Sequence, residues 1–171
     1  MSKTFTLAAL NAMTQEEFTN ALGAIFEHSP WVAQRAAARR PFASVQELHA
    51  AMADAVRNAA EEERIALIRA HPELAGKAAV RGELTEESTR EQKGAGLDRC
   101  SPEEFARLQH LNSSYNDKFG FPFVIAVKGH DRQSILDNFE RRLGNERDAE
   151  ARECIEQIIK IGGFRLAEAV H

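Results

Sequence analysis

The chain of 171 residues has little of several features that mark particular protein classes. Its two cysteines, Cys100 and Cys154, form no CxxC pair, which favours neither a disulfide scaffold nor a thiolate zinc site. No segment approaches the run of about 20 apolar residues that spans a bilayer, and residues 1–10 lack the apolar core of a signal peptide. A formal net charge of −4 argues against a general nucleic-acid binder, which would carry a basic stripe. We therefore expect a protein of the reducing cytoplasm without a nucleic-acid or membrane partner.

What is present is the composition of a folded helical protein. Hydrophobic residues make up 43% and charged residues 28% of the chain, a normal globular balance. Apolar residues recur at helical spacing, and capping-box spacing occurs at Thr14 with Glu17, Ser44 with Glu47 and Ser101 with Glu104. Helices are predicted over about 15–27, 31–39, 44–56, 61–70 and 85–94, and from 101, 131 and 145 onward, the last interrupted at Gly162-Gly163. With no repeat or linker, the pattern predicts a single all-α domain over 1–171, a compact multi-helix bundle.

One segment breaks the helical pattern. Residues 119–129, FGFPFVIAVKG, read locally as a buried strand, but no second convincing strand is available to pair with it. Buried backbone N–H and C=O groups need partners. Either carbonyls of a nearby helix or loop, or water, supply them, or a bound ligand uses them. We expect one extended buried segment here inside an otherwise helical fold.

Residues 71–97 carry the most unusual pattern in the chain. His71 lies directly before Pro72 on a predicted loop, and Ser88, Glu91 and Gln92 follow at i, i+3 and i+4, so that they share one face of a short helix. Residues 85–94 contain no large apolar side chain with which such a helix could dock. Either this is a solvated surface helix, or its polar face lines a cavity.

Three motifs together resemble the signature of a known family. HPELAGK at 71–77, STREQKGAGL at 88–97 and LNSSYNDKFGFPFVIAVKG at 111–129 are similar in order and spacing to the ureidoimidazoline decarboxylases. These enzymes act on 2-oxo-4-hydroxy-4-carboxy-5-ureidoimidazoline (OHCU), an intermediate of urate breakdown, and yield (S)-allantoin. The resemblance spans nearly the whole chain and implies a compact all-α bundle, usually a homodimer. The chain lacks the Ser-Lys-Leu type of peroxisomal ending, which favours a bacterial, cytoplasmic form.

The resemblance also implies which residues form the site. His71 and Glu91 correspond to the catalytic pair, and no metal or organic cofactor is implied. The positions that match substrate contacts are Pro72, Ser88, Gln92, the main chain of Phe123, Val124, Ile125, Ala126 and Val127, and the late arginine, Arg165.

These residue types suit a decarboxylation without a cofactor. The carbon of OHCU that loses CO2 adjoins a ring C=N, which can take up the electron pair, and the resulting enol-like ring must then be protonated on one face. A histidine suits such proton traffic near neutral pH, and a neighbouring glutamate can fix its tautomer and stabilise its protonated form. Arg165 can offer a planar fork to a carboxylate or ureido oxygen.

Two other functions fit parts of the sequence. A metal-dependent hydrolase could use His71, Glu73 and Glu91 with another histidine, but the His-Pro-Glu triplet at 71–73 lacks the HExxH spacing that places two ligands on one helical face. A helical interaction module without catalysis would present a sizeable exposed apolar patch, whereas the predicted helices have polar outer faces. A metal analysis tests the first alternative and a turnover assay the second.

Overall fold

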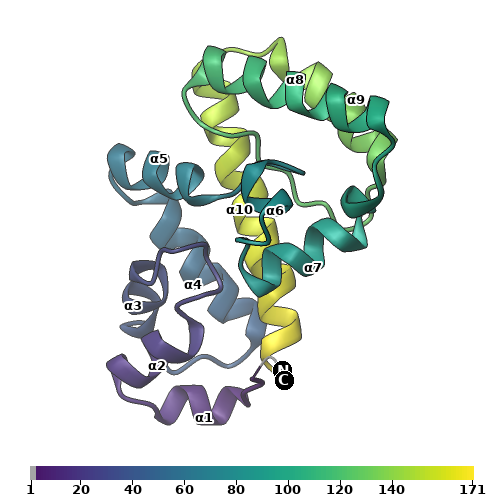
Figure 1. Cartoon of the computed structure of the whole chain (residues 1–171). Helices are drawn as coiled ribbons and strands as arrows, with labels where there is room; N and C mark the ends of the chain where they lie inside the picture. Colours follow the sequence, from purple (N-terminus) through teal and green to yellow (C-terminus); the bar gives the residue numbers. More distant parts are fainter. Residues whose placement is uncertain (1–2) are drawn as a thin grey trace. The chain divides into compact units, whose positions relative to one another are not determined.

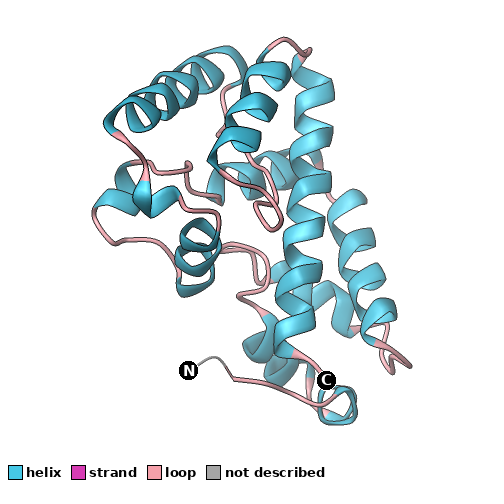
Figure 2. Ribbon diagram, turned by 90° about the vertical axis from the view of Figure 1, so that its right-hand side faces the viewer, coloured by secondary structure: helices cyan, strands magenta, loops and turns pink. Residues whose placement is uncertain are grey.

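The computed structural model describes residues 3–171, and within them it contains helices and loops but no β-strand beyond one isolated bridge (Figures 1 and 2). The prediction of an all-α fold is therefore confirmed. No helix of the described part is both long and apolar enough for a bilayer. The helices are α1 (Leu7–Ala12), α2 (Gln15–Leu22), α3 (Trp31–Ala37), α4 (Val45–Arg57), α5 (Glu61–Ala70), α6 (Lys77–Val80), α7 (Glu86–Gly94), the 3-10 turn η1 (Leu97–Arg99), α8 (Pro102–Phe119), α9 (Arg132–Leu143) and α10 (Arg147–Ala169).

The described chain forms two compact units. The terminal unit combines the residues through Ala70 with Ile158–His171, and the central unit is His71–Gln157. Helix α10 contributes its first half to the central unit and its second half to the terminal unit. A single domain over 1–171 stays a prediction.

The terminal unit is built from α1 to α5 and the end of α10. Helix α3 lies against both α2 and α4 (Figure 1), and their inward faces bury Phe18, Leu48 and Met52 completely. The two ends of the chain meet in a parallel bridge between Phe5 and Val170, where the Phe5 N–H donates to the Ala169 carbonyl at 2.8 Å.

Two helix boundaries differ from the sequence prediction. Helix α2 ends at Leu22 rather than near residue 27, with Gly23 as its C-cap. Helix α10 runs without a break through Gly162 and Gly163, so the predicted interruption is wrong. A Cβ at position 162 would lie 2.6 Å from Cζ of Phe26, and one at position 163 would lie 3.0 Å from Cε1 of His49. The two glycines therefore let aromatic rings pack directly against the helix backbone, which offsets their poor helix propensity.

The central unit places a buried, non-helical segment between α8 and α9. Helix α8 ends at Phe119, Gly120 adopts a left-handed conformation (φ 79°), and Phe121 to Val127 are all buried without forming a strand. Aromatic rings surround the segment, with Phe123 stacked on Phe139 at a centroid distance of 3.9 Å and edge-on to Tyr115 at 5.4 Å. A buried segment without a ladder partner inside a helical fold was predicted, and the structure confirms it.

Candidate active site

The loop that follows His71 is fixed to α7 by Gln92. His71 itself is buried, with 7% of its surface exposed, and Pro72 is half-buried. Oε1 of Gln92 accepts a hydrogen bond from the Ala75 N–H at 2.9 Å, and its Nε2 donates to the Glu73 carbonyl at 3.4 Å. Gln92 is thus hydrogen-bonded to the loop at Glu73 and Ala75, directly after His71 and Pro72.

Three amide side chains of α8 hold the same loop from a second helix. Gln109 donates to the Ala75 carbonyl at 2.8 Å and Asn112 to the Leu74 carbonyl at 3.0 Å. Asn116 donates to the Glu73 carboxylate at 2.7 Å. With the bond from Gln92, each of the three successive carbonyls from Glu73 to Ala75 accepts from a primary amide. This explains how the loop supports the left-handed conformation of Ala75 (φ 50°).

Helix α7 buries the polar face that the sequence singles out. Ser88 and Gln92 are 4% and 7% exposed, Glu91 is half-buried, and Thr89, Arg90 and Lys93 face solvent. Thr85 caps the helix by accepting from the Ser88 N–H at 3.2 Å. Of the two alternatives for this helix, a fully solvated one is wrong. Its polar face is turned into the protein.

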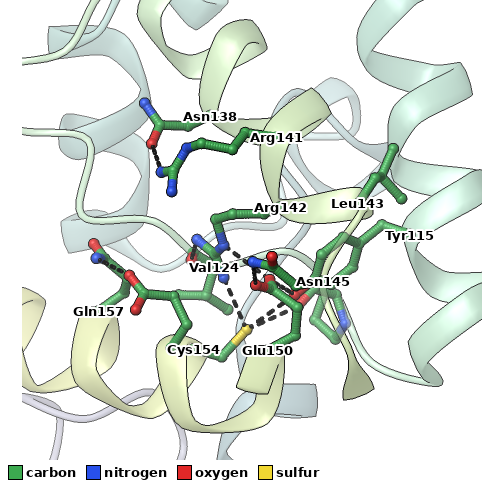
Figure 3. A network of polar contacts seen from close by, with 12 residues as sticks. Tyr115, Val124, Asn138, Arg141, Arg142, Leu143, Asn145, Glu150, Cys154 and Gln157 are labelled. Atoms are coloured by element: carbon green, nitrogen blue, oxygen red, sulfur yellow. Dashed lines mark hydrogen bonds and ion pairs between the residues drawn. The ribbon is translucent and has the colours of Figure 1, made fainter. Parts of the chain in front are cut away.

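The segment Phe123–Val127 receives its hydrogen bonds mainly from side chains. The Val124 carbonyl accepts from Nη1 of Arg142 at 2.7 Å (Figure 3), and the Ala126 N–H donates to Oε1 of Gln157 at 3.0 Å. The Val127 carbonyl accepts from the His130 N–H in a turn. Protein side chains therefore hydrogen-bond to Val124 and Ala126. The N–H groups of Ile125 and Val127 have no hydrogen-bond partner within the described residues.

Arg165 lies in the terminal unit, where it is 4% exposed. Its Nη2 contacts Oε1 of Glu27 at 3.0 Å, and its Nη1 donates to the Ile25 carbonyl at 3.2 Å. Glu27 is also buried, so the pair is a buried ion pair. The unbroken α10 helix, rather than a glycine hinge, carries Arg165 to this position.

The described residues contain no group of three or more His, Cys, Asp and Glu side chains placed to hold a metal ion. Glu73, one member of the set considered for a hydrolase, has its carboxylate bonded to Asn116. The central unit thus brings together the loop after His71 and Pro72, the Gln92 side of α7 and the amides of α8.

Comparison with known proteins identifies the family. The profile of the OHCU decarboxylase family matches residues 11–167. The chain belongs to the OHCU decarboxylase family. It is 42% identical to the 2-oxo-4-hydroxy-4-carboxy-5-ureidoimidazoline decarboxylase of Haloferax volcanii, over 95% of both chains. It is 41% identical to the uric acid degradation bifunctional protein PucL of Bacillus subtilis, over 97% of this chain and 33% of that protein.

Solved structures of related proteins have the same fold. A crystal structure of (S)-allantoin synthase superposes with a TM-score of 0.78 at 25% identity, covering 97% of this chain and 54% of that one. A crystal structure of OHCU decarboxylase in the presence of (S)-allantoin gives a TM-score of 0.67 at 22% identity, covering 81% and 89%. The second likeness concerns the fold alone.

In this member of the OHCU decarboxylase family, sequence reasoning missed the side chains that hold the site segments. These are Gln109, Asn112 and Asn116 on α8, Arg142 on α9 and Gln157 on α10. The α8 amides did carry a signal, since their spacing of three and four residues places them on one helical face. Arg142 and Gln157 carried none, because nothing near them in sequence distinguishes them from surface residues.

Proposed function

We propose that the protein is an OHCU decarboxylase that converts OHCU to (S)-allantoin in urate breakdown, without a metal or organic cofactor. The observation that carries the proposal is the 42% identity to the Haloferax volcanii decarboxylase over 95% of both chains. A further support is that His71, Ser88 and Gln92 are buried polar residues in a chain that otherwise buries mostly apolar ones.

His71 acts as the general acid and base. Loss of CO2 leaves an electron pair that the adjacent ring C=N takes up, and a proton is then delivered to the ureido-bearing carbon on one face. Histidine can carry this proton near neutral pH. Since four amide side chains hold residues 73–75, the imidazole two residues earlier starts from a fixed loop, which favours delivery to a single face.

Glu91 orients His71 and stabilises its protonated form. It lies on α7, one turn from Ser88 and beside the buried Gln92, and it is half-buried. A carboxylate in this position stabilises an imidazolium more than a neutral amide would.

Substrate recognition combines side chains with main chain. Ser88 and Pro72 contact the ring, as does Gln92, whose primary amide has two N–H groups and two lone pairs and can bond substrate as well as residues 73–75. The Ile125 and Val127 N–H groups offer donors from a rigid buried segment. Arg165 is included because the family resemblance matches it to a substrate-contacting position, where a guanidinium suits a carboxylate or ureido oxygen.

Two properties follow from the family resemblance rather than from the site. The protein is proposed to act as a homodimer and in the cytoplasm.

The direct test is turnover of freshly generated OHCU by the purified protein, followed by circular dichroism of the (S)-allantoin formed. His71→Ala is expected to remain folded and to lose activity by about 10²–10⁴-fold, the usual contribution of general acid–base catalysis. Less than tenfold loss in a folded His71→Ala protein contradicts the role of His71. No OHCU consumption by the parent protein contradicts the proposed function itself.

A further inference from the structure

The segment Phe123–Val127 behaves like a β-strand whose neighbouring strands have been replaced by side chains. The Val124 carbonyl accepts from Arg142 at 2.7 Å and the Ala126 N–H donates to Gln157 at 3.0 Å. In a sheet, ladder bonds would fix such a segment along its whole length. Here two side chains, Arg142 on α9 and Gln157 on α10, fix it at two residues.

Arg142 is itself held rigidly. It is 1% exposed, and its Nε donates to Oε1 of Glu150 at 2.8 Å while its Nη2 lies 3.3 Å from the Cys154 sulfur (Figure 3). Tyr115 donates to the same Glu150 oxygen at 2.6 Å. Burial raises the pKa of the Cys154 thiol, so the thiol stays neutral and Glu150 balances the guanidinium charge.

Gln157 is oriented by its own helix. Its Nε2 donates to Oε1 of Glu153 at 2.8 Å, one turn earlier on α10. With the amide nitrogen engaged in this way, the amide oxygen points to the Ala126 N–H. Gln157 is half-buried, so its substitution should disturb the core little.

Stability alone does not account for the buried Arg142–Glu150 pair. Replacing a buried ion pair by apolar residues of similar volume is often neutral or stabilising, because both charges are costly to desolvate. What an apolar side chain cannot do is donate to the Val124 carbonyl. The pair therefore has a local role that packing could not replace, and this role concerns the conformation of the segment.

We propose that Arg142 and Gln157 are positioning residues for substrate binding. By fixing Val124 and Ala126, they set the orientation of the intervening Ile125 and of Val127, whose N–H groups face the ligand. This inference rests on the proposed function, in which these N–H groups contact the substrate ring. Neither side chain touches the substrate.

The experiment compares Gln157→Met with a matched control, Gln133→Met. Gln133 on α9 makes the same kind of one-turn bond, donating to Asp137 at 2.9 Å, but it does not contact the segment. For Gln157→Met we expect KM to rise about tenfold with kcat changed less than threefold, because contacts shared by ground and transition states affect KM alone. The affinity for (S)-allantoin, measured by calorimetry, should fall in parallel. Gln133→Met should match the parent in both.

Arg142→Lys provides a second, independent variant. A lysine keeps the charge beside Glu150 but lacks the planar fork needed to bond Glu150 and Val124 together, so we expect the same rise in KM, at or above that of Gln157→Met. Melting temperatures of all variants separate loss of positioning from loss of fold. A folded Gln157→Met protein with KM and (S)-allantoin affinity within twofold of the parent overturns the inference while leaving the proposed function intact. An inactive parent protein overturns the proposed function first.

Discussion

Four amide side chains and one guanidinium make most of the hydrogen bonds that hold the two non-helical site segments of the central unit. The amides, from Gln92, Gln109, Asn112 and Asn116, bind residues 73–75, and Arg142 binds Val124. An amide can donate and accept within one planar group, which suits it to bridging backbone groups that lack a ladder partner. At the scale of single residues, these side chains supply the backbone hydrogen bonds that neighbouring strands would supply in a sheet.

Glu91→Gln is expected to leave the site's shape intact while reducing kcat substantially. Glutamine still accepts a hydrogen bond, but it does not stabilise an imidazolium as a carboxylate does. Measurement of kcat beside the affinity for (S)-allantoin decides the matter. Near-parent affinity with poor turnover supports a His71–Glu91 dyad, whereas full activity would make Glu91 a surface acid.

Substitutions in the buried Arg165–Glu27 ion pair are expected to affect both catalysis and stability. Arg165→Lys keeps the charge but not the planar fork, so kcat/KM should fall, and Arg165→Ala should fall further. Glu27→Gln, which leaves the buried guanidinium without its anion, should lower stability by about 3–5 kcal/mol. Kinetics with a substrate titration and thermal unfolding test the two effects separately. Parent-like kinetics in both Arg165 variants would restrict the residue to the ion pair with Glu27.

The sequence singles out the motif residues but not the residues that support them. His71, Ser88, Gln92 and Arg165 were predicted as site residues, and all four are buried although polar. Their hydrogen-bond partners were not predicted, because a partner is selected by proximity in the fold. Glu27, for example, is 138 residues from Arg165 in the chain, and no local pattern connects them.

At the scale of helices, starting points were predicted well. Full capping boxes form at Thr14 with Glu17 and at Ser101 with Glu104. Such signals are local, so they can be read without the fold. Helix α1, in contrast, was not predicted, since it has only six residues. The break predicted in α10 is wrong because glycine's low helix propensity is outweighed by the rings of Phe26 and His49, which pack against Gly162 and Gly163.

The two glycines of α10 lead to a stability prediction. Gly162→Ala would raise helix propensity by about 1 kcal/mol, yet the new methyl group would lie 2.6 Å from Phe26. Overpacking of this kind typically costs about 1–3 kcal/mol, so we expect a lower melting temperature.

Gly94→Ala is the matched control for this change. Gly94 is the last residue of α7, and a Cβ there would meet no atom within 4 Å. Thermal unfolding should show no loss, or a small gain, for Gly94→Ala. An equal or higher melting temperature for Gly162→Ala would mean that Phe26 can move aside.

At the scale of the whole molecule, the chemistry predicts independence from metal ions. OHCU carries its own electron sink, so exhaustive dialysis against a chelator should leave turnover unchanged. Activity that disappears on dialysis and returns only with added Zn²⁺ or Mn²⁺ would favour the hydrolase alternative instead. Metal analysis of the dialysed protein provides the control.

The fold class was predictable from helical periodicity, but the division into two units was not. The central unit is one continuous stretch of chain, His71–Gln157, whereas the terminal unit needs Ile158–His171 to be complete. Periodicity reports which faces are apolar and not which distant segment covers them. Contacts such as Gly162 with Phe26 therefore had to come from the structure.

The discontinuity of the terminal unit has a consequence for the order of folding during synthesis. Domains generally begin to fold as they leave the ribosome, the N-terminal one first. Here the first 70 residues emerge long before the stretch that carries Leu166 and Val170, both buried, and that pairs with Phe5. The central unit, although translated later, has all of its chain available sooner. The terminal unit, whose first segment is synthesised before the central unit, can therefore complete its fold only after the central unit is fully synthesised.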